Sequence, residues 1–134
     1  MFKYTICEPL NPNIVDKGFI SKEDFIQVLN EFPWLEMLNE QIAADESKIC
    51  YSPSLELVNT TTNHALAISI IEPNQFYIFY KRPKTITKRK WFKSVEVFEP
   101  DYLSERLDQT EQEMKDAFHA LLNNDLTELE SRWG

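Results

Sequence analysis

The hydrophobic residues of this chain change their spacing twice along its length, and this change constrains the fold more than any other feature. In residues 21–45 they recur at helical spacing, from about residue 48 to residue 98 they tend to alternate, and after Pro100 helical spacing returns. Segregated helical and extended segments are typical of an α+β protein, in which helices pack on an antiparallel sheet. The length of 134 residues suits a single domain, residues 1–134.

The first third of the chain is expected to be mainly helical. Residues 2–7 alternate partly and predict a short strand before the helices. Ser21 can cap a helix whose apolar face then carries Phe25 and Leu29. Pro33 cannot continue that helix but can begin another, so two consecutive helices and one helix kinked at Pro33 fit the pattern equally well.

The middle of the chain predicts about four strands in an antiparallel meander. The extended segments lie around Leu55 and Leu57, at 65–71, at 76–81 and at 91–98, and short turn-like segments separate most of them. Residues 76–81 are apolar on both faces until the lysine, so this strand is expected to be central in the sheet.

The last third predicts a long acidic helix over residues 101–123. Leu103, Leu107, Met114 and Phe118 fall in one narrow sector of such a helix, and acidic residues fall opposite. Asp125 is a suitable cap for a short final helix. The expected architecture is therefore an antiparallel sheet with N-terminal and C-terminal helices packed on it.

Composition disfavours several classes of function. The two glycines, Gly18 and Gly134, are too few for a glycine-rich phosphate loop. No segment approaches the roughly 18 apolar residues of a membrane span, and no signal peptide is visible, so we expect a cytoplasmic protein without a membrane partner. Cys7 and Cys50 are then expected to be reduced thiols, although the sequence leaves a bridge between them open.

The charge of the chain is concentrated. The net charge is −8, yet residues 81–93 carry seven basic residues and no acidic one. Lys88, Arg89 and Lys90 could bind phosphates while Trp91 stacks on a base, which makes a nucleic-acid-binding or regulatory module the alternative hypothesis. The acidic remainder would oppose a polyanion, so we favour a structural role for this basic strip, as a long hairpin loop or as an edge strand that resists aggregation.

The sequence offers no catalytic or metal-binding motif. Neither His64 nor His119 has a second metal ligand that stands out at helical or hairpin spacing. A nucleophile such as Cys50, Ser52 or Ser54 would have to meet His64 in space, and no local motif supports that arrangement. We therefore expect no enzyme activity, no metal and no cofactor, and an enzyme of unrecognised type is the second alternative.

The order of the expected elements and the acidic character of the chain resemble those of a known class of proteins. The chain combines an acidic domain, helices that precede the aromatic segment Phe76-Tyr77-Ile78-Phe79-Tyr80, and a closing acidic helix that ends in Leu121-Leu122-Asn123-Asn124-Asp125-Leu126. In this it resembles the small acidic immunity proteins (antitoxins) that bacteria pair with polymorphic or contact-delivered toxins. The resemblance implies stoichiometric binding that blocks a toxin's active site, often that of a basic nuclease.

The leading hypothesis is accordingly a non-enzymatic protein-binding inhibitor. Glu105, Asp108 and Asp116 on the outer side of the expected helix would attract a cationic partner, such as a cognate toxin. Tyr102 and Trp91 would anchor the complex, because aromatic residues carry a large share of interface energy.

Overall fold

The computed structural model describes residues 1–133, which form one six-stranded antiparallel sheet and four α-helices. The strands lie in the order β2-β1-β3-β4-β5-β6. The elements are, in chain order, β1 (Phe2–Cys7), β2 (Val15–Ile20), α1 (Lys22–Glu31), α2 (Trp34–Ala43), a 3₁₀ turn (Glu46–Lys48), β3 (Ser54–Asn59), β4 (His64–Glu72), β5 (Gln75–Lys90), β6 (Lys93–Gln109), α3 (Glu111–Leu122) and α4 (Leu126–Trp133). The expected α+β class is confirmed, with more strands than the four expected.

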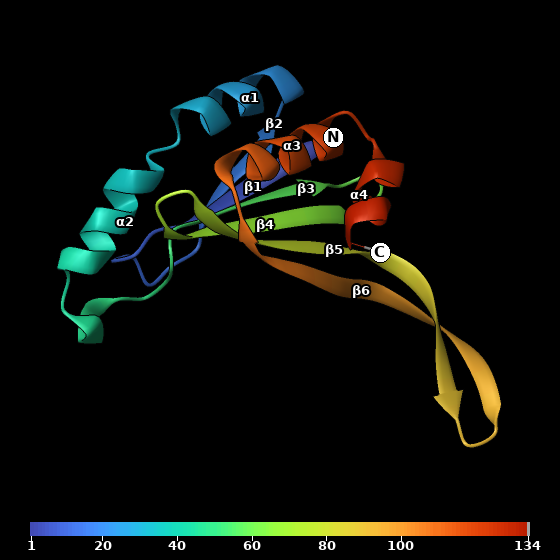
Figure 1. Ribbon diagram of the computed structural model, residues 1–134. Helices are drawn as coiled ribbons and strands as arrows, with labels where there is room; N and C mark the ends of the chain where they lie inside the picture. The colour runs from blue at the N-terminus through green and yellow to red at the C-terminus, as the bar shows by residue number, and fades with distance from the viewer. Residues whose placement is uncertain (134) are drawn as a thin grey trace.

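The helices cover one face of the sheet, and the core lies between the two layers (Figure 1). Alternate side chains of β3, β4 and β5 point into this core, among them Leu57, Ile68 and Ile78, each fully buried. The rings of Phe25 on α1 and Phe118 on α3 meet there with centroids 5.3 Å apart. This burial of apolar area is the main stabilising contribution to the fold.

Several local predictions are confirmed. The Ser21 hydroxyl accepts a hydrogen bond from the backbone N–H of Asp24 and caps α1, and Pro33 separates α1 from α2. Residues 2–7 form β1, and the segments around 65–71 and 76–81 lie in β4 and β5, with β5 inside the sheet. Asp125 accepts from the backbone N–H of Glu128 at the start of α4. Cys7 and Cys50 are free thiols.

Strand β2 was missed because its sequence does not alternate. Gly18, at φ 75°, lies in it, and the register between β1 and β2 shifts between Tyr4 and Thr5. Such an irregular edge strand carries little of the period-two signal on which the prediction depended.

The helix expected over residues 101–123 is confirmed only from Glu111 to Leu122 and is wrong before that. Residues 93–109 belong to β6, and α3 begins only at Glu111, where Thr110 and Glu113 form a reciprocal capping box. Leu103 and Leu107 are four residues apart, a spacing that fits one face of a strand as well as one face of a helix. Pairing with β5 decides between the two, and both leucines stay exposed on the uncovered face of the sheet. Among residues 1–133, no helix is long and apolar enough to cross a membrane.

Candidate functional site

The most distinctive feature of the molecule is a two-stranded arm that extends beyond the sheet. Strand β4 pairs with β5 only as far as Lys81, whereas β5 and β6 continue to pair with each other up to Lys90 and Lys93. We call residues 83–100 the arm. Figure 1 shows it projecting away from the helices and from the other strands.

Two fully exposed aromatic residues form the turn at the end of the arm. The side chains of Trp91 and Phe92 are 90% and 97% exposed. Trp91 also has a positive φ of 60°, in the left-handed region that glycine adopts freely and a bulky residue avoids. A two-residue hairpin turn with this geometry normally selects glycine or asparagine, so folding alone does not account for an aromatic pair here.

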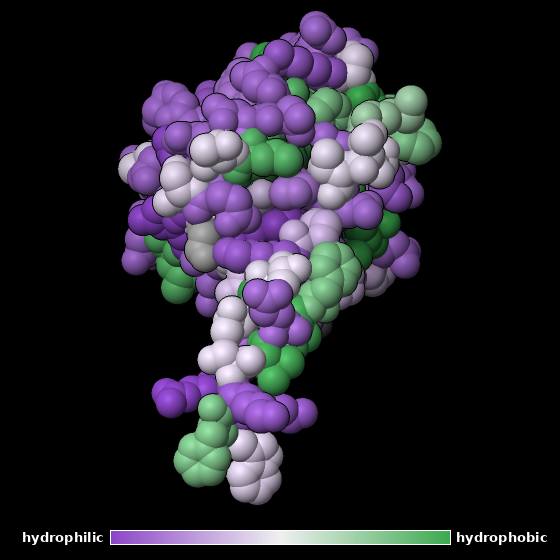
Figure 2. All heavy atoms as spheres, turned by 90° about the vertical axis from the view of Figure 1, so that its right-hand side faces the viewer, coloured by the Kyte–Doolittle hydropathy of each residue, from purple (hydrophilic) through white to green (hydrophobic). Residues whose placement is uncertain are grey.

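The arm is basic close to this aromatic tip. Five basic and two acidic residues give it a net charge of +3, and the whole chain is at −8, so the remainder carries −11. The four cations nearest the tip are Lys88, Arg89, Lys90 and Lys93, and Lys88 contacts Glu99 at 3.0 Å. Figure 2 shows green and white spheres at the end of the arm and a band of purple, hydrophilic ones just above them.

Exposed apolar side chains continue from the tip along β6, with Val95 and Phe98 on opposite faces of the arm. Six of the twelve exposed large hydrophobic residues of the described chain lie between positions 91 and 107, namely Trp91, Phe92, Val95, Phe98, Leu103 and Leu107. This concentration in the tip and in β6, rather than scatter over the surface, is typical of an interaction site.

A buried arginine fixes the base of the arm. Arg82 is fully buried, and its Nε donates to Oε1 of Glu130 on α4 at 2.7 Å. Its Nη1 donates to the Ser104 hydroxyl at 2.7 Å, and its guanidinium carbon lies 4.6 Å from the ring centroid of Tyr80 and 4.8 Å from that of Tyr102. Lys84 Nζ reaches Glu130 Oε2 at 3.3 Å. These contacts join β5, β6 and α4 and so hold the direction of the arm relative to the body.

The same contacts set the titration of the groups around Arg82. Burial alone would raise the pKa of the Glu130 carboxyl, but the hydrogen bonds and charges of Arg82 and Lys84 outweigh it and hold the pKa below its ordinary value. Burial raises the pKa of Tyr80 to about 12. His64, whose Nδ1 is hydrogen-bonded to the Tyr80 hydroxyl, has its pKa lowered by burial. At neutral pH the cluster therefore consists of an Arg82–Glu130 ion pair beside a neutral histidine and a neutral phenol.

The five residues predicted to bind a partner do not share one surface. Trp91 is at the tip of the arm, while Tyr102 is half-buried at its base against Arg82 and is not an exposed anchor. Glu105 lies opposite Phe79 on the uncovered sheet face, and the side chains of Asp108 and Asp116 accept hydrogen bonds from Gln75 and Gln112 respectively.

The four residues predicted to bind nucleic acid in the alternative hypothesis lie together in the structure. Strand β5 ends with Lys88, Arg89 and Lys90, Trp91 follows in the turn, and all four residues are exposed. Sequence reasoning missed two features of this region, the burial of Arg82 and the exposure of Phe98 on the arm. The length of the arm could have been predicted from the sequence, because β-branched residues, which favour strands, flank the turn at 85–87 and at 95 and 97.

Ser54, one of the nucleophiles considered in the sequence, does not lie beside His64. Ser54 and His64 lie at opposite ends of the β3–β4 pair, and the Ser54 hydroxyl is 2.7 Å from that of Ser69. Residues 1–133 contain no group of three or more His, Cys, Asp or Glu side chains that could hold a metal ion.

No protein-family model, no curated protein and no solved structure matches the chain.

Proposed function

We propose that this chain is a non-enzymatic protein-binding module, whose β5–β6 arm inserts into a cleft of a partner protein and blocks it. The observation that carries the proposal is the Trp91–Phe92 pair, almost fully exposed at a turn where the backbone of Trp91 favours glycine. Exposed aromatic residues of this kind supply the largest energies in protein interfaces once a partner buries them. Inhibition by occupancy is also what the resemblance to immunity proteins implies.

Rigidity at the base of the arm supports this role. The contacts of Arg82 with Glu130, Ser104 and the two tyrosine rings fix the arm before any partner arrives. A preorganised element loses less conformational freedom on binding than a mobile loop, so more of the interaction energy appears as affinity.

The charge of the arm indicates the chemistry of its partner. A basic, aromatic tip fits a cleft that is acidic at its rim and apolar inside. The cleft of a nuclease, which has to attract a polyanion, would repel the four cations at residues 88–93. The partner proposed here is therefore a protein with an acidic cleft, and it differs from the cationic toxin that the sequence alone suggested.

Nucleic-acid binding is the second candidate, because four residues that could carry it are adjacent and exposed at the tip. The distance from Lys84 to Trp91 is about 23 Å at roughly 3.3 Å per residue. Because the Debye length is about 8 Å at physiological salt, the acidic body hardly opposes a polyanion at the tip. A two-stranded ribbon also fits the major groove of DNA. The acidic residues Glu96 and Glu99 within the arm, and the exposed apolar side chains along β6, favour a protein instead.

Affinity capture from the source cell with matched variants tests the proposal. The bait is the full chain, and the test variant is Trp91→Ala/Phe92→Ala. The control is Ile42→Ala, which removes a 72% exposed hydrophobic side chain from α2, far from the arm. We expect a stoichiometric protein that wild type and the Ile42→Ala control retain after nuclease treatment, and that the double variant loses. Retention by the double variant would contradict the proposal, and material that nuclease removes would favour the second candidate.

A further inference from the structure

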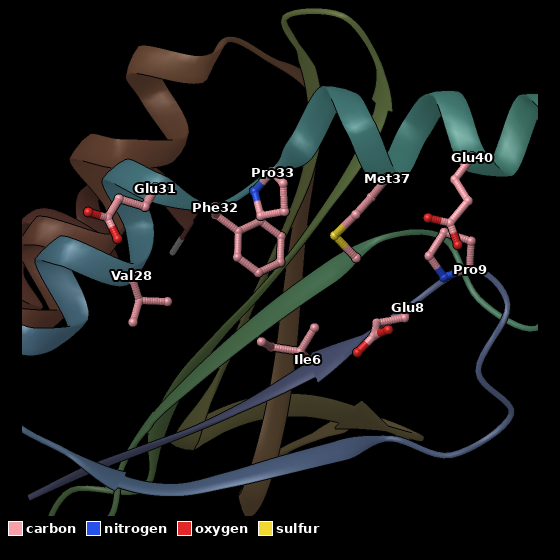
Figure 3. A pocket seen from close by; sticks show the side chains of 9 residues that line it. All are labelled: Ile6, Glu8, Pro9, Val28, Glu31, Phe32, Pro33, Met37 and Glu40. Carbon is pink, nitrogen blue, oxygen red and sulfur yellow. The ribbon is translucent and has the colours of Figure 1, made fainter.

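A hollow lies at the opposite end of the molecule from the arm, between the junction of α1 with α2 and the end of β1. Its volume is about 440 Å³, which falls within the range of sites that bind a drug-sized ligand or a large side chain. Its walls are mostly apolar, formed chiefly by Ile6, Val28, Phe32 and Met37 (Figure 3).

Three carboxylates surround these apolar walls. Figure 3 shows Glu8 and Glu40 near one end of the hollow and Glu31 at the other. No lysine or arginine is among the residues that line it. Within residues 1–133 neither Glu8 nor Glu40 forms an ion pair, and Glu31 accepts a hydrogen bond from Gln27. The hollow thus suits an apolar group that carries positive charges on its flanks.

The tip of the arm has this chemistry. Trp91 and Phe92 are the apolar group, and Lys90 and Lys93 flank them on the two strands. The arm and the hollow lie at opposite ends of the sheet, so a chain cannot place its own tip in its own hollow (Figure 1).

We propose that the hollow bounded by Glu8, Glu31 and Glu40 receives the arm tip of a second copy of this chain, so that copies associate head to tail. The inference rests on the proposed use of the arm as a docking element, and it adds the receiving surface. Such an interface joins two different patches, and it therefore extends into chains or closes into rings rather than stopping at a symmetric dimer. A partner with a better cleft would compete for the same arm and dissociate the copies.

A complementation experiment tests this directly. The arm variant is Trp91→Ala/Phe92→Ala, which keeps the hollow, and the hollow variant is Glu8→Lys/Glu40→Lys, which keeps the arm. The matched control is Glu46→Lys/Glu72→Lys, which makes the same change in net charge at two exposed residues outside the hollow. Sedimentation velocity over a range of protein and salt concentrations gives the association state, and circular dichroism checks that each variant is folded.

We expect the wild-type chain to associate increasingly with concentration, and less so in high salt. Each variant alone should have an association constant reduced by about thirtyfold or more, as for other interface hot spots. The charge control should associate like wild type. An equimolar mixture of the two variants should form a 1:1 dimer that does not grow further, because the intact arm of one meets the intact hollow of the other.

Two results would overturn the inference. One is a wild-type chain that stays monomeric at all concentrations, and the other is a mixture of variants that does not pair. Either result leaves the proposed function untouched if the hollow variant still captures a foreign partner through its arm. The proposed function has its own test, because it predicts that the arm variant loses the foreign partner and that the hollow variant keeps it.

Discussion

The guanidinium of Arg82 and the carboxylate of Glu130 join the base of the arm to the last helix, with Nε 2.7 Å from Oε1. The arginine is fully buried, whereas solvent reaches part of the glutamate. Because Arg82 cannot lose its proton, it depends on acceptors that remain in place. The pair therefore links the stability of the fold to the orientation of the proposed docking element.

Replacing Glu130 by glutamine should destabilise the fold. The buried guanidinium would keep a neutral acceptor but lose its counter-charge, and we expect a loss of about 1–3 kcal/mol in the free energy of unfolding. The control is Glu128→Gln, which breaks the surface pair of Glu128 with Arg132 and should cost about 0.5 kcal/mol or less. Urea denaturation of both variants measures the difference, and equal effects would contradict the structural role of Arg82.

The stability of the fold should also depend on pH through His64. Burial lowers the pKa of folded His64 below 6.5, so the unfolded chain binds more protons in the window between the two values. Stability therefore rises as pH increases through that window and is fully present above 6.5. His64→Gln should flatten this part of the curve of unfolding free energy against pH. An unchanged curve would show that His64 is not the group responsible.

Glu130 should make a second pH-dependent contribution to the free energy of unfolding, which is lost at lower pH. The pKa of Glu130 is depressed in the folded state, so its contribution is present above 4.5 and is lost as pH falls through the folded value. In Glu130→Gln this acid-side slope should be smaller than in wild type, while the slope around His64 remains. Denaturation midpoints measured across both windows distinguish the two groups, and an identical acid slope in the variant would contradict this assignment.

The turn at the tip should be more stable without its aromatic residue. Trp91→Gly removes the cost of a bulky residue at positive φ, which is of order 1–2 kcal/mol. Amide hydrogen exchange of residues 85–98 should then become slower, although the variant binds its partner less well. Faster exchange in Trp91→Gly would mean that Trp91 stabilises the arm itself, and the case for a binding role would fail.

Much of the local structure could be predicted because its causes are local in the sequence. Ser21 lies next to the helix that it caps, and Phe25 and Leu29 show which face of α1 is buried. The β6 strand was misread because the four-residue spacing of Leu103 and Leu107 fits both periods, and pairing with β5 decided the outcome.

The base of the arm could not be predicted, because its cause is distant in the sequence. The burial of Arg82 depends on Glu130, 48 residues away, whereas the sequence analysis grouped Arg82 with the other cations of one basic strip. The strip is in fact divided, with Arg82 inside the fold and Lys88 to Lys93 at the tip. Charge pattern alone does not separate these two environments.

Site-specific photo-crosslinking in the source cell tests the role of the arm most directly. A photoreactive residue replaces Phe92 in one variant and, in a control, Phe19, which is 67% exposed on β2 at the sheet edge opposite β6 and outside the hollow. We predict discrete protein adducts, to a foreign partner or to a second copy, that form from position 92 and are absent from position 19. Equal adducts at both positions, or adducts at position 92 that consist of nucleic acid alone, would contradict it.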